Sequence, residues 1–157
     1  MNDALIQGIS ALVGTLGFSL MFRLKGKKLI CASLGGAVVW GAYYLLNTFV
    51  FEDVFVCNLI ASMIATAYSQ ILARILKAPA TLFIFPSIVV LVPGGMLYYS
   101  MGDIISGNMT NGIVGAVETL KVAVALAFGI VIIVALTKVI YYFIDFKKVR
   151  KKDEKGI

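Results

Sequence analysis

The sequence contains no histidine, and only 14% of its 157 residues are charged. Without histidine, and with its few carboxylates scattered, the chain offers neither a histidine-based catalytic centre nor a metal site. A soluble domain has about 25% charged residues, whereas this chain is 61% hydrophobic and has a mean hydropathy of +0.97. These values exclude a soluble enzyme and a nucleic-acid-binding domain. We expect a membrane protein that surrounds itself with lipid, catalyses no reaction and needs no cofactor.

Five apolar stretches follow one another along the chain; the first four are near the roughly 20 residues with which a helix spans a bilayer, and the fifth is predicted to form one longer helix. They cover residues 4–22, 29–47, 54–73, 81–101 and 112–146. The alternating pattern of a membrane β-barrel is absent from them. The sequence therefore predicts an all-α integral membrane protein, with a five-helix transmembrane domain in residues 1–146 and a basic tail in residues 147–157.

Positive charge gathers in alternate connections between these stretches. Twelve of the fourteen Lys and Arg residues lie in residues 23–28, at Arg74 and Lys77, and in the tail. The other connections carry acidic residues such as Asp53 and Asp103 and no basic ones. Because basic loops stay in the cytoplasm, we expect the N-terminus outside and the C-terminus inside a bacterial inner (plasma) membrane. The net charge of +6 then belongs to cytoplasmic loops and not to a nucleic-acid site.

All three prolines of the chain lie in one window, at Pro79, Pro86 and Pro93, and Gly94 and Gly95 follow directly. A proline inside a helix removes a backbone donor and clashes with the preceding turn, so the fourth helix should break near the middle of the membrane. At that depth, broken backbone is tolerated where it is buried in protein or lines a wet cavity. Secondary transporters build substrate sites from such helices. We interpret the break as part of a substrate pathway, with a packing kink as the alternative.

The same window resembles a known family. Residues 78–83 (APATLF), Pro86, residues 91–95 (LVPGG) and Tyr98 resemble the central motif of the threonine/serine exporter family. Almost the whole chain is similar to the carboxy-terminal half of the fused exporters, which in many bacteria is a separate small membrane subunit. Val90 departs from the pattern because many members have a proline there, so the break should be less severe than in those members.

A second match consists of residues 17–22 and the pair Gly35-Gly36. The resemblance implies secondary export of threonine and serine or, in some two-subunit members, of a small dicarboxylate such as succinate. It also implies a larger membrane subunit similar to the amino-terminal half of the fused exporters. We expect the proton gradient to drive export, and a homo-oligomer is a further possibility.

Candidate pathway residues lie at the break and on the polar third helix. They are Pro86, Pro93, Gly94, Gly95, Tyr98, Asn58 and Gln70. We expect Asn58 and Gln70, twelve residues apart, to lie near a common face of the third helix. For these two residues, and for Thr66, Tyr68 and Ser69, interhelical hydrogen bonds are the favoured role. A cavity wall beside the broken helix is the alternative.

Glu118, in the fifth apolar stretch, is the only plausible carboxylate for proton coupling, and Lys121 follows three residues later on the same helical face, where the two can pair. Ionisable residues inside a membrane suggest function, so Glu118 and Lys121 are candidates for ion coupling. A solvated ion pair at the outer end of the helix is the alternative.

Aromatic and small residues complete the pattern. Trp40, Tyr43 and Tyr44 approach the predicted outer surface, and Tyr141 and Tyr142 the inner one, as interfacial belts do. Small residues recur at four-residue spacing, which favours close helix packing in lipid. They are Ser10 and Gly14; Ser33, Ala37 and Gly41; Ala61, Ala65, Ser69 and Ala73; and Gly115, Thr119, Ala123 and Ala127. Their number favours an oligomer or a partner membrane subunit.

The sequence thus predicts a small five-helix subunit of an exporter for small polar metabolites. The broken fourth helix would present backbone groups to the charged ends of the substrate, and the third and fifth helices would wall the path. Two other functions remain open at this point. One is a membrane scaffold or assembly subunit that transports nothing, and the other is a channel-like homo-oligomer.

Overall fold

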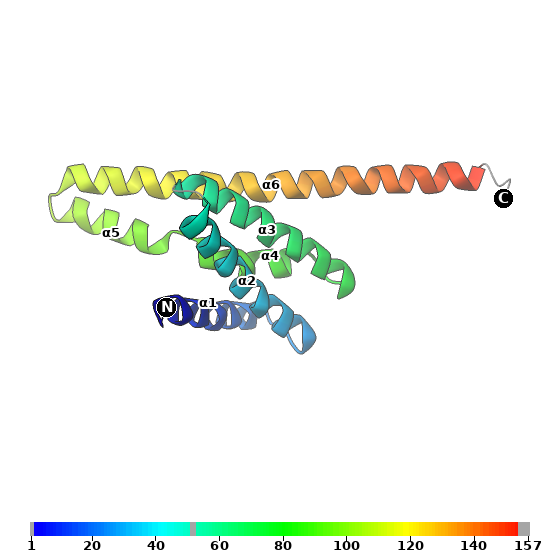
Figure 1. Ribbon diagram of the computed structural model, residues 1–157, viewed down its shortest axis with the longest axis horizontal. Helices are drawn as coiled ribbons and strands as arrows, with labels where there is room; N and C mark the ends of the chain where they lie inside the picture. The colour runs from blue at the N-terminus through cyan, green and yellow to red at the C-terminus, as the bar shows by residue number, and fades with distance from the viewer. Residues whose placement is uncertain (1, 51–52, 154–157) are drawn as a thin grey trace.

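The computed structural model describes the backbone of residues 2–50 and 53–153 and the side chains of residues 5–50 and 53–143. All regular structure in these residues is helical (Figure 1). The elements are α1 (Asn2–Met21), α2 (Lys27–Phe49), α3 (Val54–Ile75), α4 (Thr81–Ile88), the 3₁₀ turn η1 (Val89–Leu91), α5 (Gly94–Ile105) and α6 (Met109–Asp153). The predicted all-α class is therefore confirmed. The five apolar stretches correspond to α1, α2, α3, the α4–η1–α5 segment and α6.

Three helices are long and apolar enough to cross a membrane: α2, α3 and, over Met109–Phe143, α6. A fourth candidate span combines Thr81–Leu91 with Gly94–Ile105, two parts bent by 49° at the break between them. In α1 the described apolar part, Leu5–Met21, is shorter than a full span. The described residues thus contain three or four candidate spans, and the expected count of five is not confirmed.

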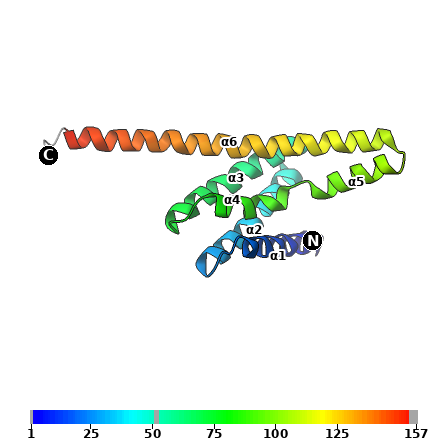
Figure 2. The ribbon, with the colours of Figure 1, turned by 180° about the vertical axis from the view of Figure 1, so that it is seen from behind.

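The longest element is α6, whose 45 residues extend over about 67 Å at about 1.5 Å per residue. A short turn joins it to α5, which folds back along its first part, and α3 crosses it further along (Figure 1). The hydroxyl of Ser100 on α5 donates a hydrogen bond of 2.6 Å to the carbonyl of Gly112 on α6. The C-terminal part of α6 runs beyond the other helices (Figure 2).

Helix α2 lies against α1, α3 and α4, and a pair of glycines allows this. A Cβ atom on Gly36 would collide with the side chain of Thr15 on α1. A Cβ atom on Gly35 would collide with the hydroxyl of Ser87 on α4 and lie 2.9 Å from the ring of Tyr68 on α3. Because a glycine has no side chain, three helices approach the backbone of α2 closely at this level.

Small hydroxyl residues fill much of the interior. Those buried include Thr15, Ser19, Ser33, Ser62, Thr66, Ser69, Ser87, Ser100 and Thr119. Most donate a hydrogen bond to a carbonyl one turn earlier in their own helix. A hydroxyl satisfied in this way presents only a small, nearly apolar surface to the neighbouring helix. These residues therefore serve close packing more than hydrogen bonding between helices.

The interhelical hydrogen bonds expected of α3 are confirmed at one position only. The hydroxyl of Tyr68 donates to the carbonyl of Cys31 on α2, at 2.8 Å. Thr66 and Ser69 instead donate to Ser62 and Ala65 of their own helix, so the expectation is wrong for them. It is wrong because a short hydroxyl side chain reaches the carbonyl one turn back more easily than a neighbouring helix.

The small-residue stripes differ in where they face. Those of α2 and α3 contribute buried residues to the interior, among them Ser33, Ala61 and Ala65. The stripe predicted on α1, Ser10 and Gly14, is exposed. The buried face of α1 is formed one position later, by Ala11, Thr15 and Ser19. In α6, Thr119 is buried, whereas Ala123 and Ala127 face outward.

Candidate functional site

The predicted break in the fourth span is present and lies at Val92 and Pro93. After the tight turn of η1, Val92 is extended, with φ −64° and ψ 125°. Pro93 follows with φ −79° and ψ 50°, and the N–H of Gly94 donates to the carbonyl of Val92 at 2.8 Å. These values describe an inverse γ-turn centred on Pro93. The chain then enters α5, so one apolar stretch becomes two helical parts.

The break leaves backbone groups of both kinds without their helical partners. The carbonyl of Val90 would accept from residue 93 in a 3₁₀ turn, but Pro93 has no N–H. In an α-helix it would accept from Gly94, whose N–H is bonded to Val92 instead. On the other side, the N–H groups of Gly95 and Met96 belong to the first turn of α5, where no helical acceptor precedes them. The break therefore offers a hydrogen-bond acceptor and two donors.

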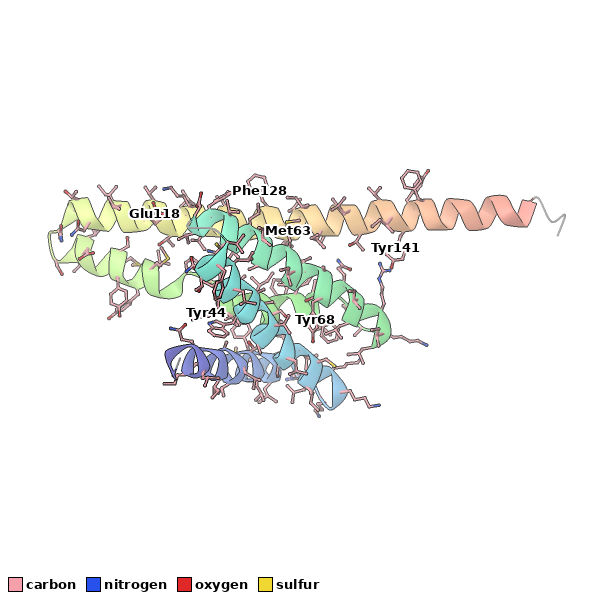
Figure 3. All side chains as sticks on the ribbon, in the orientation of Figure 1. Tyr44, Met63, Tyr68, Glu118, Phe128 and Tyr141 are labelled. Atoms are coloured by element: carbon pink, nitrogen blue, oxygen red, sulfur yellow. The ribbon has the colours of Figure 1, made fainter. Side chains whose placement is uncertain are left out.

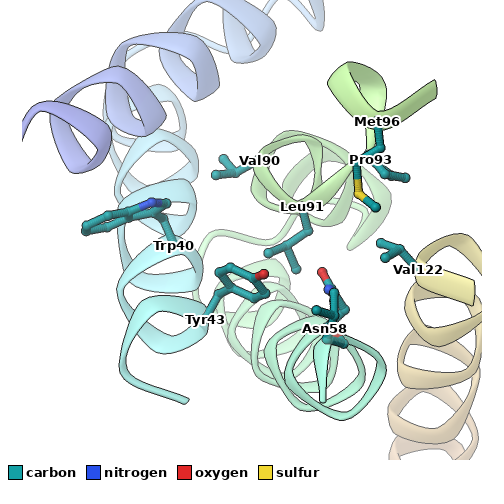
Figure 4. A pocket seen from close by; sticks show the side chains of 9 residues that line it. Trp40, Tyr43, Asn58, Val90, Leu91, Pro93, Met96 and Val122 are labelled. Atoms are coloured by element: carbon teal, nitrogen blue, oxygen red, sulfur yellow. Dashed lines mark hydrogen bonds between the residues drawn. The ribbon is translucent and has the colours of Figure 1, made fainter. Parts of the chain in front are cut away.

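A cavity of about 230 Å³ opens beside this break (Figure 4). Its wall is built from all parts of the fold except α1 and α4. The lining residues are Trp40 and Tyr43 of α2, Val54 and Asn58 of α3, Val90 and Leu91 of η1, Pro93, Met96 of α5 and Val122 of α6. Most of the wall is apolar. Such walls with few polar groups are typical of small-molecule sites.

Two side chains bring polar atoms into the cavity. Asn58 is only 4% exposed, and its amide nitrogen donates to the carbonyl of Val54 in its own helix at 2.8 Å. Its oxygen points toward the cavity, as does the hydroxyl of Tyr43 (Figure 4). An amide oxygen accepts hydrogen bonds from an ammonium group, and a phenol can donate one to a carboxylate. The cavity can thus meet both ends of a small zwitterion.

Of the predicted pathway residues, the structure brings Asn58 and Pro93 together in the cavity wall. Gly94 and Gly95 come next along the chain, as the first residues of α5. A Cβ atom on either glycine would meet nothing within 4 Å. Pro86 is fully buried inside α4 and is not among the residues that line the cavity.

The structure does not bring Tyr98 and Gln70 to the cavity. Tyr98 is 73% exposed on α5, where its ring packs edge-on against that of Tyr99. Gln70 lines a different cavity of about 300 Å³ between α3 and α6. The expectation that Asn58 and Gln70 share a face is wrong, because twelve residues at about 100° each place them about 120° apart.

The pairing expected of Glu118 and Lys121 is confirmed. Their side chains form an ion pair of 2.6 Å on α6, where Figure 3 marks Glu118. The two side chains are 43% and 55% exposed, respectively. Neither lines the cavity, although Val122, the residue after Lys121, does.

Trp40 and Tyr43 were expected in an aromatic belt, and the structure places both in the cavity wall. Their three-residue spacing puts them on one face of α2, which is compatible with either position. Trp40 also packs against Gly8, where a Cβ atom would lie 3.0 Å from its ring. Nothing in the sequence singles out Met96 or Val122, which enter the wall only through the fold.

A bent span, a mostly apolar cavity with two polar side chains at its break, and several apolar helices are the features of a multi-pass helical membrane protein of the transporter type. The chain belongs to the threonine/serine exporter family: a family model described as "Threonine/Serine exporter, ThrE" matches residues 7–136. The resemblance inferred from the motifs is thereby confirmed, and the family is one of transporters and not of enzymes. No curated protein and no solved structure matches the chain.

Proposed function

We propose that this chain is a subunit of a proton-driven secondary exporter and that the cavity beside Pro93 is part of its substrate path. The substrates would be small polar metabolites, threonine and serine above all, with a small dicarboxylate such as succinate as the other candidate. The observation that carries the proposal is the coincidence of a broken span and a partly polar cavity in a chain of this family.

Substrate recognition would use both kinds of group that the break exposes. The ammonium of an amino acid would lie near the oxygen of Asn58 and the carbonyl of Val90. Its carboxylate would meet the hydroxyl of Tyr43 and the first N–H groups of α5, where the helix dipole favours negative charge. Discontinuous helices bind substrates in this way in other transporter folds. The modest cavity volume of about 230 Å³ favours small substrates.

Opening and closing of the path would come from α5. In the described part of the chain, α6 is the only helix with which α5 packs extensively. The other attachment of α5 is the turn at Pro93, where the span bends by 49°. A change of this bend would move Met96 relative to η1 and α3 and so change access to the cavity. Small changes at such hinges are a common means of gating.

The arrangement of the turns supports the predicted orientation. The α1–α2 and α3–α4 turns and the C-terminal end of α6 lie toward one end of the molecule, opposite the N-terminus and the α5–α6 turn (Figure 1). We propose that the first end is cytoplasmic. A single cysteine at Thr48 should then react with an impermeant reagent from outside, and one at Lys25 only after the membrane is opened. The reverse labelling pattern would contradict this orientation.

We further propose that the chain works with a larger membrane subunit of the same family, or with a second copy of itself. Small residues that no other helix covers, such as Ser10 and Gly14 on α1 and Ala127 on α6, leave room for a close helix partner. Co-purification from native membranes tests this. Recovery of the chain alone and monomeric, with full export activity in liposomes, would contradict it.

Replacement of Asn58 by Leu tests the proposed path. The change removes the polar atom while keeping the size of a buried residue, so the protein should insert and reach normal abundance. Loss of a hydrogen bond to a charged group costs about 1.5–3 kcal/mol, so export should fall by about ten- to a hundredfold. Gln70→Leu is the control because it also replaces an amide side chain of α3 by leucine, but outside the cavity, and it should alter export by less than about twofold. Equal effects of the two variants would contradict the proposal and favour a scaffold.

A further inference from the structure

A second and larger cavity, of about 530 Å³, lies between the α1–α2 turn and the α3–α4 connection. Four basic residues from the α1–α2 turn and the start of α2 line it: Arg23, Lys25, Lys27 and Lys28. No acidic residue is among its lining residues. The cavity is separate from the one beside Pro93 and shares no lining residue with it.

The backbone of the turn is held in one conformation, which keeps these charges around the cavity. Arg23 has φ 55°, in the left-handed region, and the N–H of Leu24 donates to the carbonyl of Ser19 at 3.2 Å. These features form the Schellman motif that ends α1. Leu24 is only 4% exposed and packs into a hydrophobic cluster with Ala32 and Phe83. The turn is therefore anchored by a buried side chain between the basic residues.

The positive charges have no counter-ion within the described part of the chain. The one ion pair recorded among the described side chains joins Glu118 to Lys121 on α6. Four cations in six residues repel one another, and salt screens this repulsion only over about 10 Å at 0.1 M. An anion bound among them would relieve the repulsion. Arg and Lys both donate hydrogen bonds to phosphate oxygens.

The rest of the cavity wall is apolar. Leu76 and Leu82 line it, together with Phe22, whose ring stacks on that of Phe85 at a centroid distance of 6.0 Å. Phe85 and Phe22 are both exposed, so this wall continues onto the outer, lipid-facing surface of the molecule. A ligand that fits must combine an anionic group with an apolar part. An inorganic phosphate or a soluble metabolite would leave the apolar wall unused.

We propose that this cavity binds the phosphate group of an anionic phospholipid. The phosphodiester lies among the four basic residues, and the first acyl carbons lie against Leu76, Leu82 and Phe22. The position of the cavity fits this ligand, because it lies where the apolar helices α1 and α3 end and α2 and α4 begin, at the level of the lipid head groups. Basic pockets between membrane helices on the cytoplasmic side commonly hold anionic lipids.

The test compares the binding of phosphatidylglycerol and phosphatidylcholine to the full chain in detergent, by native mass spectrometry. The wild-type chain should retain phosphatidylglycerol more tightly by at least about tenfold, since each basic residue near a head group contributes about fivefold. A variant with Arg23, Lys25, Lys27 and Lys28 replaced by Gln should lose this preference. The matched control replaces Lys147, Lys148, Arg150 and Lys151 by Gln, which removes the same charge and should keep the preference.

A second variant separates a lipid site from general attraction of phosphate. Leu82→Trp fills the space beside the apolar wall and leaves all four charges. Retention of phosphatidylglycerol should therefore fall by about fivefold or more, while competition by inorganic phosphate stays as weak as in the wild-type chain. This variant also tests the proposal if the variant with four Gln substitutions fails to insert into the membrane. Equal loss of preference in the turn and tail variants would overturn the proposal, and so would competition by inorganic phosphate as strong as that by phosphatidylglycerol.

Discussion

Two pairs of adjacent glycines in this chain occupy opposite environments. Gly35 and Gly36 lie in the middle of α2, where a Cβ atom on either would collide with a neighbouring helix. Gly94 and Gly95 begin α5, where a Cβ atom would meet nothing within 4 Å. The first pair is buried and the second is exposed. The same dipeptide thus serves close packing at one place and a helix break at the other.

We propose that the first pair serves the fold and the second pair serves transport. At the first pair, side chains of α1, α3 and α4 pack against the backbone of α2, so extra atoms there must push helices apart. At the second pair there is no close neighbour and no left-handed φ, so glycine is not required for packing or for backbone strain. We propose that its role there is to leave the first amides of α5 accessible. Substitutions at the two pairs should therefore affect different measurements.

The largest expected effect is loss of the folded protein on Gly36→Ala. The added methyl group collides with Thr15, and overpacking of this kind costs about 1–3 kcal/mol. Membrane abundance and the melting temperature in detergent should both fall. Gly41→Ala is the control, because the same change on the same helix meets nothing within 4 Å. A second change, Thr15→Gly, should restore stability to Gly36→Ala, and failure of this rescue would contradict close packing as the cause.

An intermediate effect is expected from Gly94→Leu, on transport and not on folding. Abundance should stay within about twofold of wild type, because the site is open and leucine is favoured over glycine in a helix by about 1 kcal/mol. Export should fall by about tenfold or more, since the side chain covers the first amides of α5 and loss of a hydrogen bond to a charged group costs about 1.5–3 kcal/mol. Export rate and abundance are measured together. Normal export at normal abundance would show that the break is only a packing kink.

The smallest effect on stability is expected from Glu118→Gln. Its ion pair with Lys121 is about half exposed, and such pairs contribute about 0–1 kcal/mol. We propose that Glu118 couples export to the proton gradient. The variant should then still exchange substrate between the two sides of the membrane, but an imposed pH gradient should no longer accelerate it. Lys138→Gln removes one charge from the same helix and serves as the control. If an imposed pH gradient still accelerated export by Glu118→Gln as it does for the wild type, the coupling role would be excluded.

Much of the fold follows from the sequence, because each of the five apolar stretches is a long run bounded by charged residues. The break at Pro93 was also predictable, because a proline removes a backbone hydrogen-bond donor from a helix in any surroundings. The exact face that each helix buries was harder to predict. On α1 the expected stripe of Ser10 and Gly14 is exposed, and Thr15 is buried one position further on. In lipid, apolar and small residues are acceptable on either face, so hydrophobicity does not decide between them.

The candidate site was predictable only in part. Asn58 and Pro93 stood out because a polar side chain and a proline are conspicuous in apolar helices. Tyr43 was expected at the membrane surface, and its place in the cavity depends on how α2 packs against α3 and η1. Tyr98 is close to the break in sequence, but it lies on the exposed face of α5. Proximity in sequence does not say to which side of a helix a residue points.

The central claim, that the cavity beside the break receives the substrate, is tested most directly by substrate protection of a cysteine at Met96. In a background of Cys31→Ala and Cys57→Ala, Met96→Cys places a thiol in the cavity wall, and Ile133→Cys places one in the separate cavity between α3 and α6. Threonine or serine, added to membranes that contain the complete exporter, should slow the reaction of the first thiol with a small reagent and leave the second unchanged. Equal protection of both cysteines, or of neither, would contradict the claim.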